Sequence, residues 1–220
     1  MRTRSRLRLE GICFDMDGTL TNTIPAVLHS FRVTFEHFLA RTYADDEIRA
    51  LFGPTEEGII QKVLPDRSAE GVRYYHRVYE EYHREYAAKF QGIEEALDLL
   101  KQDKQKRLGI VTGKGPVSVS ITLEQLGLGR FFDVIECGSS IGAAKPEAIR
   151  KIARRWKVDP REIGYLGDAA YDMRAAKEAG AIPLGAAWDK GSEHDELEEL
   201  AYAVFLDVES FVRWIRSSLI

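Results

Sequence analysis

The sequence predicts an α/β protein, with a doubly wound parallel sheet and an all-helical insertion. From residue 92 onward, short apolar runs alternate with helical patterns, which is typical of a parallel sheet covered by helices on both faces. One more apolar run, at residues 9–14, precedes a long stretch with helical periodicity at residues 22–90. A length of 220 residues with 45% hydrophobic residues is enough for a large domain that carries such an insertion.

The insertion is expected to contain four helical segments, which begin near residues 24, 45, 55 and 66. Gly53 and Pro54 separate the second segment from the third, because neither residue continues a helix well. The fourth segment places a row of tyrosines near one face. Aromatic residues at helical spacing are more typical of a packed core than of a base-stacking platform, so the row is interpreted as core: Tyr75, Tyr79, Tyr82 and Tyr86.

The remaining chain is expected to form the sheet and its covering helices. The predicted strands are residues 9–14, 108–112, 132–137, 163–166 and 182–187, with a further short run at 203–206. Helical patterns at residues 97–100, 116–126 and 171–179, and after Pro146, lie between them. An acidic stretch at 194–200 and a terminal segment at 208–220 complete the chain. We therefore predict a Rossmann-like core from residues 1–21 and 91–220 and a helical cap domain from residues 22–90. A cap inserted there is placed to close as a lid.

Composition restricts the partners. The formal net charge of −4 offers no general basic face for nucleic acid, so a small partner is expected. The arginine-rich residues 1–8 are interpreted as a frayed tail. Cys13 and Cys137 lie in separate apolar runs without metal-ligand spacing, and both are expected to be core thiols. With no secretory segment and no membrane-spanning run in sight, the expected location is the cytoplasm, with no membrane partner.

Two carboxylates follow the first predicted strand directly. Asp15 and Asp17 stand at its carboxyl end, where open α/β sheets bind ligands. Like charges this close favour a bound cation or a shifted pKa. An isolated D-x-D-G is often only a solvated turn. A calcium loop of the EF-hand type is excluded, because glycine stands at the fourth position and Ala26 occupies the twelfth.

Three further strand-to-helix junctions carry polar residues that would meet this acidic loop. Thr112 and Gly113 follow one strand, Lys145 opens the helix after another, and Asp168 and Asp172 follow a third. In a parallel sheet all four junctions lie at the same edge. Thr112 and the amides after it can hold phosphate oxygens at a helix start. Four polar junctions in register indicate a reaction site rather than independent turns.

These motifs together resemble those of the haloacid dehalogenase superfamily, in its phosphatase branch with a helical cap and closest to phosphoglycolate phosphatase-like members. The first family motif, D-x-D-G-T, stands at residues 15–19, and the fourth, G-D-x-x-x-D, at residues 167–172. Thr112 and Lys145 match the second and third motifs. The resemblance covers nearly the whole chain, and it implies a phosphoric monoester hydrolase.

The resemblance, together with the chemistry of carboxylates, implies a role for each acidic residue. Asp15 would attack phosphorus and form an aspartyl-phosphate. Asp17 would protonate the leaving oxygen and then activate water. Mg²⁺ would be held by Asp15, the backbone carbonyl of Asp17 and Asp168, and Asp172 would support that set of ligands. The second carboxylate of the motif favours phosphoryl transfer over carbon–halogen or carbon–phosphorus cleavage.

The other roles concern phosphate and substrate. Lys145 would neutralise charge on the nucleophile and the phosphoryl group, and Thr112 would complete the catalytic set. The residues expected to bind substrate are Gly18, Thr19, Asn22, Gly53, Pro54 and Gly113. Two departures from the family pattern bear on substrate identity. The linker has Asn22 where many relatives have an acidic residue, and the second motif continues with Gly113 and Lys114 rather than asparagine.

The sequence prediction is thus a Mg²⁺-dependent phosphatase for a small phosphorylated metabolite, acting as a monomer or homodimer. A phosphosugar mutase of the same fold is an alternative, because a change in cap contacts would return the phosphoryl group to substrate. A pyrophosphatase is another. A non-catalytic binding protein is a third alternative, although such a protein would be free to lose the motif residues, and none is missing.

Overall fold

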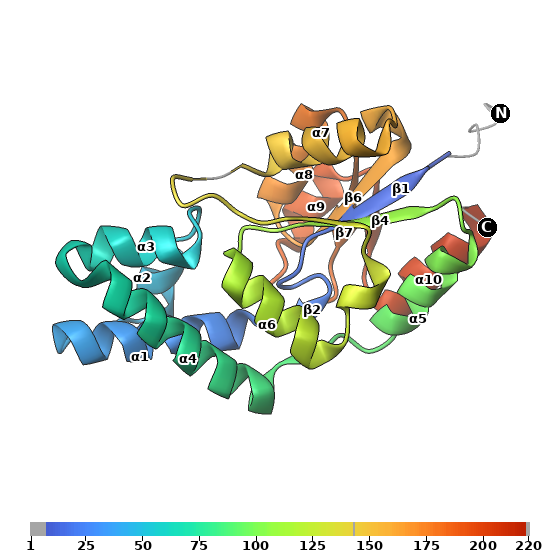
Figure 1. Cartoon of the computed structure of the whole chain (residues 1–220). Coiled ribbons are helices and arrows are strands. Elements are labelled where there is room, and N and C mark those ends of the chain that lie inside the picture. Colours follow the sequence, from blue (N-terminus) through green and yellow to red (C-terminus); the bar gives the residue numbers. More distant parts are fainter. Residues whose placement is uncertain (1–7, 143, 219–220) are drawn as a thin grey trace.

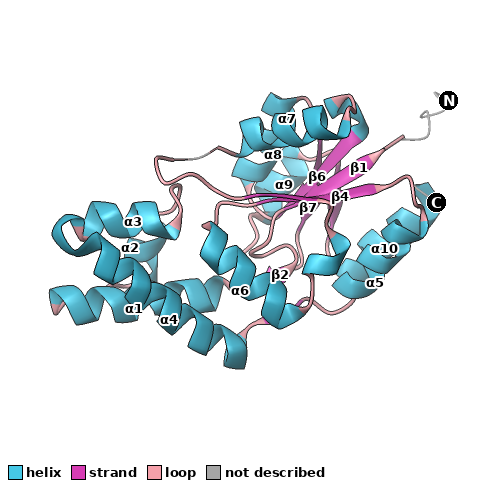
Figure 2. Cartoon of the chain, viewed as in Figure 1, coloured by secondary structure: helices cyan, strands magenta, loops and turns pink. Residues whose placement is uncertain are grey.

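The parallel sheet forms the centre of the molecule (Figures 1 and 2). The computed structural model describes residues 8–142 and 144–218. The sheet runs in the order β5-β4-β1-β6-β7-β8, and every pairing is parallel. This is the Rossmann strand order, so the predicted fold class is confirmed. The strands are β1 (Gly11–Phe14), β4 (Arg107–Val111), β5 (Val134–Glu136), β6 (Ile163–Gly167), β7 (Ile182–Ala186) and β8 (Ala203–Phe205).

Helices cover both faces of the sheet and bury its central strands. Consecutive residues of β1 face opposite sides: Ile12 and Phe14 pack in one apolar cluster and Cys13 in another. The first cluster contains α5 (Ile93–Gln102), α6 (Pro116–Leu126) and α10 (Val208–Ser218), and the second contains α7 (Lys145–Trp156) and α8 (Ala170–Ala179). The remaining core elements are α9 (His194–Leu200), η2 (Gly129–Phe131) and η3 (Pro160–Glu162).

The inserted helices pack around an apolar cluster of their own, beside the sheet (Figure 1). They are α1 (Ile24–Leu39), α2 (Asp45–Arg49), α3 (Glu56–Val63), η1 (Pro65–Arg67) and α4 (Ser68–Tyr86), and we call them the cap. Tyr75 and Tyr79 are fully buried. Tyr82 is half-buried and packs against the same cluster and against His29. The prediction of an all-core tyrosine stripe is wrong at its end, because Tyr86 is 57% exposed.

The connection between cap and core contains a short antiparallel ribbon that the sequence did not indicate. Strand β2 (Thr21–Asn22) pairs with β3 (Ala88–Lys89) where the chain leaves and re-enters the core. The expectation that residues 22–90 are wholly helical is therefore wrong at both ends. Two-residue strands are too short to show a period, and their pairing depends on distant parts of the chain.

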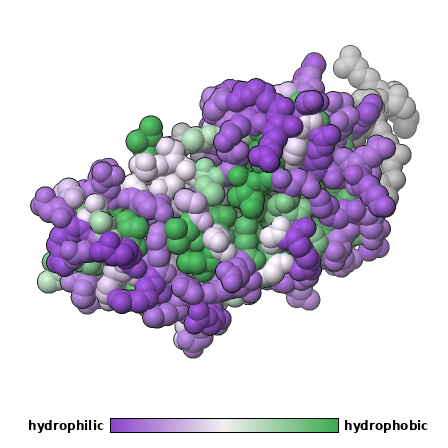
Figure 3. Space-filling view, in the orientation of Figure 1, coloured by the Kyte–Doolittle hydropathy of each residue, from purple (hydrophilic) through white to green (hydrophobic). Residues whose placement is uncertain are grey.

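The cap contacts the core along α6. The Tyr79 hydroxyl lies 2.9 Å from the Thr122 hydroxyl, and a ring nitrogen of His83 lies 2.7 Å from the amide oxygen of Gln125. In the space-filling view, apolar surface gathers toward the middle of the visible face, and hydrophilic side chains cover most of its periphery (Figure 3). No helix among the described residues is long and apolar enough to cross a membrane. Apart from Arg8, the arginine-rich tail lies outside the described residues.

Candidate active site

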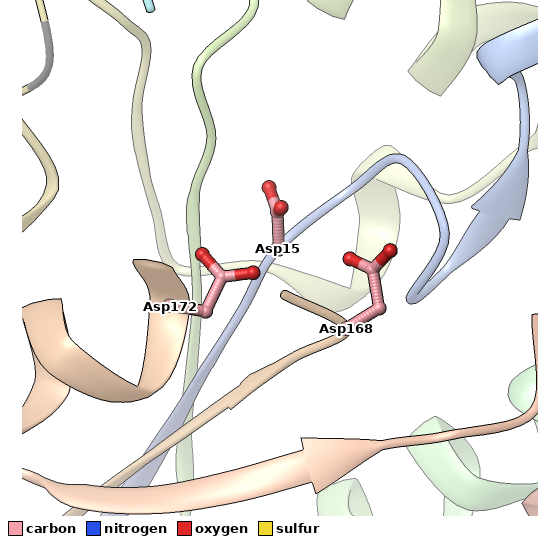
Figure 4. Close-up of side chains that lie close together, drawn as sticks. All are labelled: Asp15, Asp168 and Asp172. Carbon is pink, nitrogen blue, oxygen red and sulfur yellow. The ribbon is translucent and has the colours of Figure 1, made fainter. Parts of the chain in front are cut away.

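Three carboxylates converge where the strand order reverses, between β1 and β6. The two strands are in register, with Phe14 opposite Leu166, so the loops that follow them begin side by side. Asp15 follows β1, Asp168 follows β6, and Asp172 lies in the first turn of α8 (Figure 4). One oxygen from each lies within 4.8 Å of the others. The crevice at such a reversal is the usual ligand site of an open α/β sheet.

Asp15 is buried and held from two sides. One carboxylate oxygen accepts the Met16 amide at 2.8 Å, and the other accepts the Lys145 ammonium at 2.7 Å. Burial raises the pKa of Asp15 to about 6, and the negative charge of Asp172 adds to this, although Lys145 opposes the shift. A buried carboxylate beside a lysine is available to attack an electrophile.

Asp172 holds the Lys145 ammonium in place through a hydrogen-bonded ion pair. Its Oδ1 accepts Lys145 at 2.6 Å and the Tyr165 hydroxyl at 3.2 Å, and its Oδ2 accepts the Ala169 amide at 3.2 Å. Both oxygens are therefore engaged. This arrangement suits a supporting role beside a metal better than direct coordination.

Asp168 is closely surrounded by the loop that follows β1. The Thr19 hydroxyl donates to its Oδ1 at 3.3 Å. Gly18 has a positive φ of 74°, and a Cβ there would lie 2.1 Å from Asp168 Oδ2, so only glycine fits. Burial, followed by the charges of Asp172 and Asp15, raises the pKa of Asp168 well above its usual value. A cation between these oxygens would relieve that cost, so the donor set fits a hard divalent ion such as Mg²⁺.

Asp17 is held on one oxygen only. The Thr23 hydroxyl and the Lys114 ammonium both donate to Oδ1, the latter at 3.1 Å. Sequence reasoning recorded Lys114 only as a departure from the family pattern and gave it no role. The side chain is nevertheless 4% exposed and part of the site. The available signal was its place two residues after Thr112, at the same sheet edge.

A cavity of about 630 Å³ opens over these groups and extends to the cap. Predicted residues that line it are Asp15, Asp17, Gly53, Pro54, Thr112, Gly113, Lys145, Asp168 and Asp172. Gly18 and Thr19 are not among its lining residues; both lie behind Asp168. Asn22 does not line the cavity either, because it is exposed in β2. The structure therefore brings the four motifs together with the cap loop but leaves Asn22 apart.

The cavity also contains residues that the sequence had not marked. Arg49 and Phe52 of the cap line it, as does Glu56 at the start of α3. Cys137 lines it as well and is only half-buried, so the expectation of a core thiol is wrong for this residue. The reason is that β5 ends at Glu136, and Cys137 already belongs to the loop that faces the cavity.

Comparison with known proteins identifies the family. A family model described as haloacid dehalogenase-like hydrolase matches residues 12–185. The chain belongs to this family. The predicted resemblance and the prediction of an enzyme are thereby confirmed. The matched span includes the four motif loops and the whole cap.

Individual relatives of this haloacid dehalogenase-like hydrolase span nearly its full length. It is 30% identical over 189 residues to the pyrophosphatase PpaX of Bacillus velezensis, which covers 84% of this chain and 87% of the relative. A predicted phosphoglycolate phosphatase from Haemophilus somnus superposes with a TM-score of 0.74 at 21% identity, over 96% of this chain and 98% of that one. CbbY from Rhodobacter sphaeroides, in complex with phosphate, gives 0.76 at 22% identity, over 91% and 95%.

Proposed function

We propose that this hydrolase is a Mg²⁺-dependent phosphatase that cleaves a small, phosphoglycolate-like phosphorylated metabolite through an aspartyl-phosphate. The single observation that supports this most is the pairing of Asp15 and Lys145 at the strand-order reversal, where the two charged groups lie 2.7 Å apart and each side chain is 11% exposed. The lysine lowers the repulsion between an anionic nucleophile and an anionic phosphate.

In the first step, a carboxylate oxygen of Asp15 bonds to phosphorus while the bond from phosphorus to the leaving oxygen breaks. Asp17, whose Oδ2 accepts no hydrogen bond from the described residues, gives a proton to that leaving oxygen. In the second step, water attacks the phosphorus of the aspartyl-phosphate, Asp17 takes its proton, and Asp15 is restored as phosphate leaves. Thr112 and the Gly113 amide are proposed to hold the phosphate oxygens.

We propose that Mg²⁺ is held by Asp15, Asp168 and the backbone carbonyl of Asp17, with Asp172 in support. The crowding of three carboxylates, two buried and one half-buried, within 4.8 Å favours a divalent cation there. When bound, the ion supplies positive charge that screens the phosphate and orients it for in-line attack. Gly18 and Thr19 are proposed to hold Asp168 in place. This role takes the place of the direct contact with substrate that was expected for them from the sequence.

The helical cap, proposed as residues 22–90, is the part that selects the leaving group. Its loop residues Gly53 and Pro54 line the same cavity as Asp15. Arg49 of the cap also lines it and offers a cation for a carboxylate or second phosphate on the leaving group. The apolar cap residues Ile24, Val27, Phe31 and Ile59 complete that wall, which suits a small leaving group.

A pyrophosphatase is the second candidate, because the relatives that align over most of this chain include the pyrophosphatase PpaX. Pyrophosphate is a small substrate that the same nucleophile would attack, with phosphate as the leaving group. The phosphosugar mutase predicted as an alternative would need the leaving group to be retained and rebound. The same assay separates all three.

The test measures the release of phosphate from 5′-nucleotides, sugar phosphates, phosphoglycolate and pyrophosphate. Each substrate is assayed once with Mg²⁺ and once with EDTA. Metal-dependent release that disappears in Asp15→Asn supports the phosphatase, and the ranking of substrates selects between monoester and pyrophosphate. Isomerisation of a sugar phosphate without release supports the mutase. Folded protein that releases no phosphate from any of these and isomerises none would refute the proposed function.

A further inference from the structure

Lys114 is a buried cation that the reaction scheme above leaves without a role. Its ammonium lies 3.1 Å from Asp17 Oδ1 and 3.9 Å from Glu56 Oε1, and it sits 4.6 Å from the centre of the Tyr79 ring. The side chains of Lys114 and Glu56 are 4% and 5% exposed. Lys145 pairs with Asp15 and Asp172, so each of the two lysines holds a different catalytic carboxylate.

Glu56 reaches Lys114 from the cap. Its Oε2 accepts the backbone amide of Gly115 at 2.5 Å, whereas Oε1 has no hydrogen-bond donor among the described residues. The same turn is fixed to a second core loop, because the Thr55 amide donates to the Ser139 carbonyl at 3.0 Å. Glu56 therefore lies beside Lys114 only while the start of α3 rests on the core.

Tight packing supports this contact between the start of α3 and the core loops. A Cβ on Gly58 would lie 2.2 Å from the Ser140 carbonyl oxygen, and one on Gly115 would lie 2.3 Å from a Glu57 carboxylate oxygen. Both glycines allow the cap helix and the core loops to approach more closely than any side chain would permit. The structure therefore shows the cap closed on the loops that follow β4 and β5.

We propose that Lys114 is a positioning residue for Asp17 and that Glu56 makes this positioning depend on cap closure. Lys114 and Thr23 both hold Asp17 Oδ1, which directs Oδ2 toward the leaving oxygen. In the closed cap, Glu56 and Tyr79 surround the ammonium and keep it beside Asp17. An open cap removes both groups, so Asp17 is oriented only when the cavity is closed. This inference rests on the proposed phosphatase function.

The test uses two monoesters that differ in their need for a proton. The alkoxide leaving group of glycerol phosphate requires protonation, whereas nitrophenolate leaves from p-nitrophenyl phosphate without it. Because kcat/KM reports only steps up to release of the alcohol, it isolates the step in which Asp17 acts as acid. General acid catalysis contributes about 10²- to 10⁴-fold. We expect Lys114→Met to lower kcat/KM for glycerol phosphate by roughly 10- to 100-fold and for p-nitrophenyl phosphate by less than about threefold.

Three further variants make the test specific. Thr23→Val removes the other donor to the same oxygen and is expected to reproduce the selective loss, which keeps the test valid if Lys114→Met folds poorly. Glu56→Gln keeps an acceptor for the Gly115 amide but removes the charge, and a smaller loss of the same selectivity is expected. Lys62→Met, an exposed lysine-to-methionine change in α3, is the matched control and should alter neither value.

The outcomes separate the alternatives. Equal losses for both esters in Lys114→Met and Thr23→Val would overturn the positioning role. Phosphoglycolate is assayed as a third substrate. A loss of kcat/KM confined to phosphoglycolate, with glycerol phosphate unaffected, would mean that Lys114 binds an anionic leaving group, and would also overturn the positioning role. If Glu56→Gln does not lower kcat/KM more for glycerol phosphate than for p-nitrophenyl phosphate, the dependence on cap closure is refuted. Wild-type protein that cleaves neither ester nor phosphoglycolate would instead refute the proposed function itself.

Discussion

Replacing Asp15 by asparagine should stabilise the metal-free protein while removing its activity. Burial and neighbouring charge raise the pKa of Asp15 from 3.8 to about 6 in the folded state. A carboxyl whose pKa is raised on folding destabilises the fold once it ionises, by about 1.4 kcal/mol per unit. The shift of about two units therefore corresponds to a cost of roughly 3 kcal/mol above pH 6.

The sign of the pH dependence follows from the two pKa values. Below pH 3.8 the carboxyl is neutral in both states, so Asp15→Asn and the wild type should have similar free energies of unfolding. As the pH rises from about 4 to 6, the unfolded state ionises first and the wild type loses stability relative to the variant. Urea denaturation followed by tryptophan fluorescence, in EDTA at pH 4 and pH 7.5, measures both values.

A matched control and a clear contradiction complete this test. Asp98→Asn makes the same chemical change at an exposed position in α5 and should show no comparable pH-dependent gain. The reasoning would be refuted if Asp15→Asn did not raise the free energy of unfolding at pH 7.5, or if it raised it equally at pH 4. Phosphate release by this variant should fall below detection, since the proposed nucleophile is gone.

Three other substitutions test different parts of the site. Lys145→Ala should abolish phosphate release and lower the free energy of unfolding by about 3–5 kcal/mol, because it leaves buried carboxylates unpaired; denaturation that matches wild type would contradict this. Mg²⁺ at 100 times its Kd should stabilise the wild type by about 2.7 kcal/mol, a shift that calorimetry should find missing in Asp168→Asn. Gly138→Ala places a Cβ 2.1 Å from the Gly113 carbonyl oxygen, so the phosphate loop must move. We expect kcat/KM to fall about 10²-fold and the free energy of unfolding to fall by about 1–3 kcal/mol, and unchanged kinetics would argue against a tightly held loop.

The sequence alone was sufficient for the fold class and for the group of motif residues. Apolar runs alternating with helical patterns require a parallel sheet, and a parallel sheet brings every strand's carboxyl end to one edge. Asp15 and Asp168 directly follow their strands and Lys145 begins the helix after another strand, so the three residues were expected at the same edge of the sheet. Their meeting depends on topology and not on side-chain detail, so local patterns could predict it.

The contacts between cap and core could not be read from local patterns. The pairing of β2 with β3 and the exposure of Cys137 to the cavity depend on where the cap helices come to rest. Likewise, nothing near Lys114 in the sequence identifies Glu56 as its neighbour, because the two residues lie in different units and meet where the start of α3 contacts the core.

The raised pKa of Asp15 likewise depends partly on the sequence motif and partly on the tertiary structure. The motif determined that carboxylates would be adjacent, and that much was encoded in the sequence. The direction and size of the shift depend on how completely the tertiary structure excludes water and on how near Lys145 comes, since burial raises this pKa and the lysine lowers it. Sequence determined which groups are present in the site, and packing across the cap and core decided their surroundings, because desolvation and ion pairing depend on distances that only the folded chain defines.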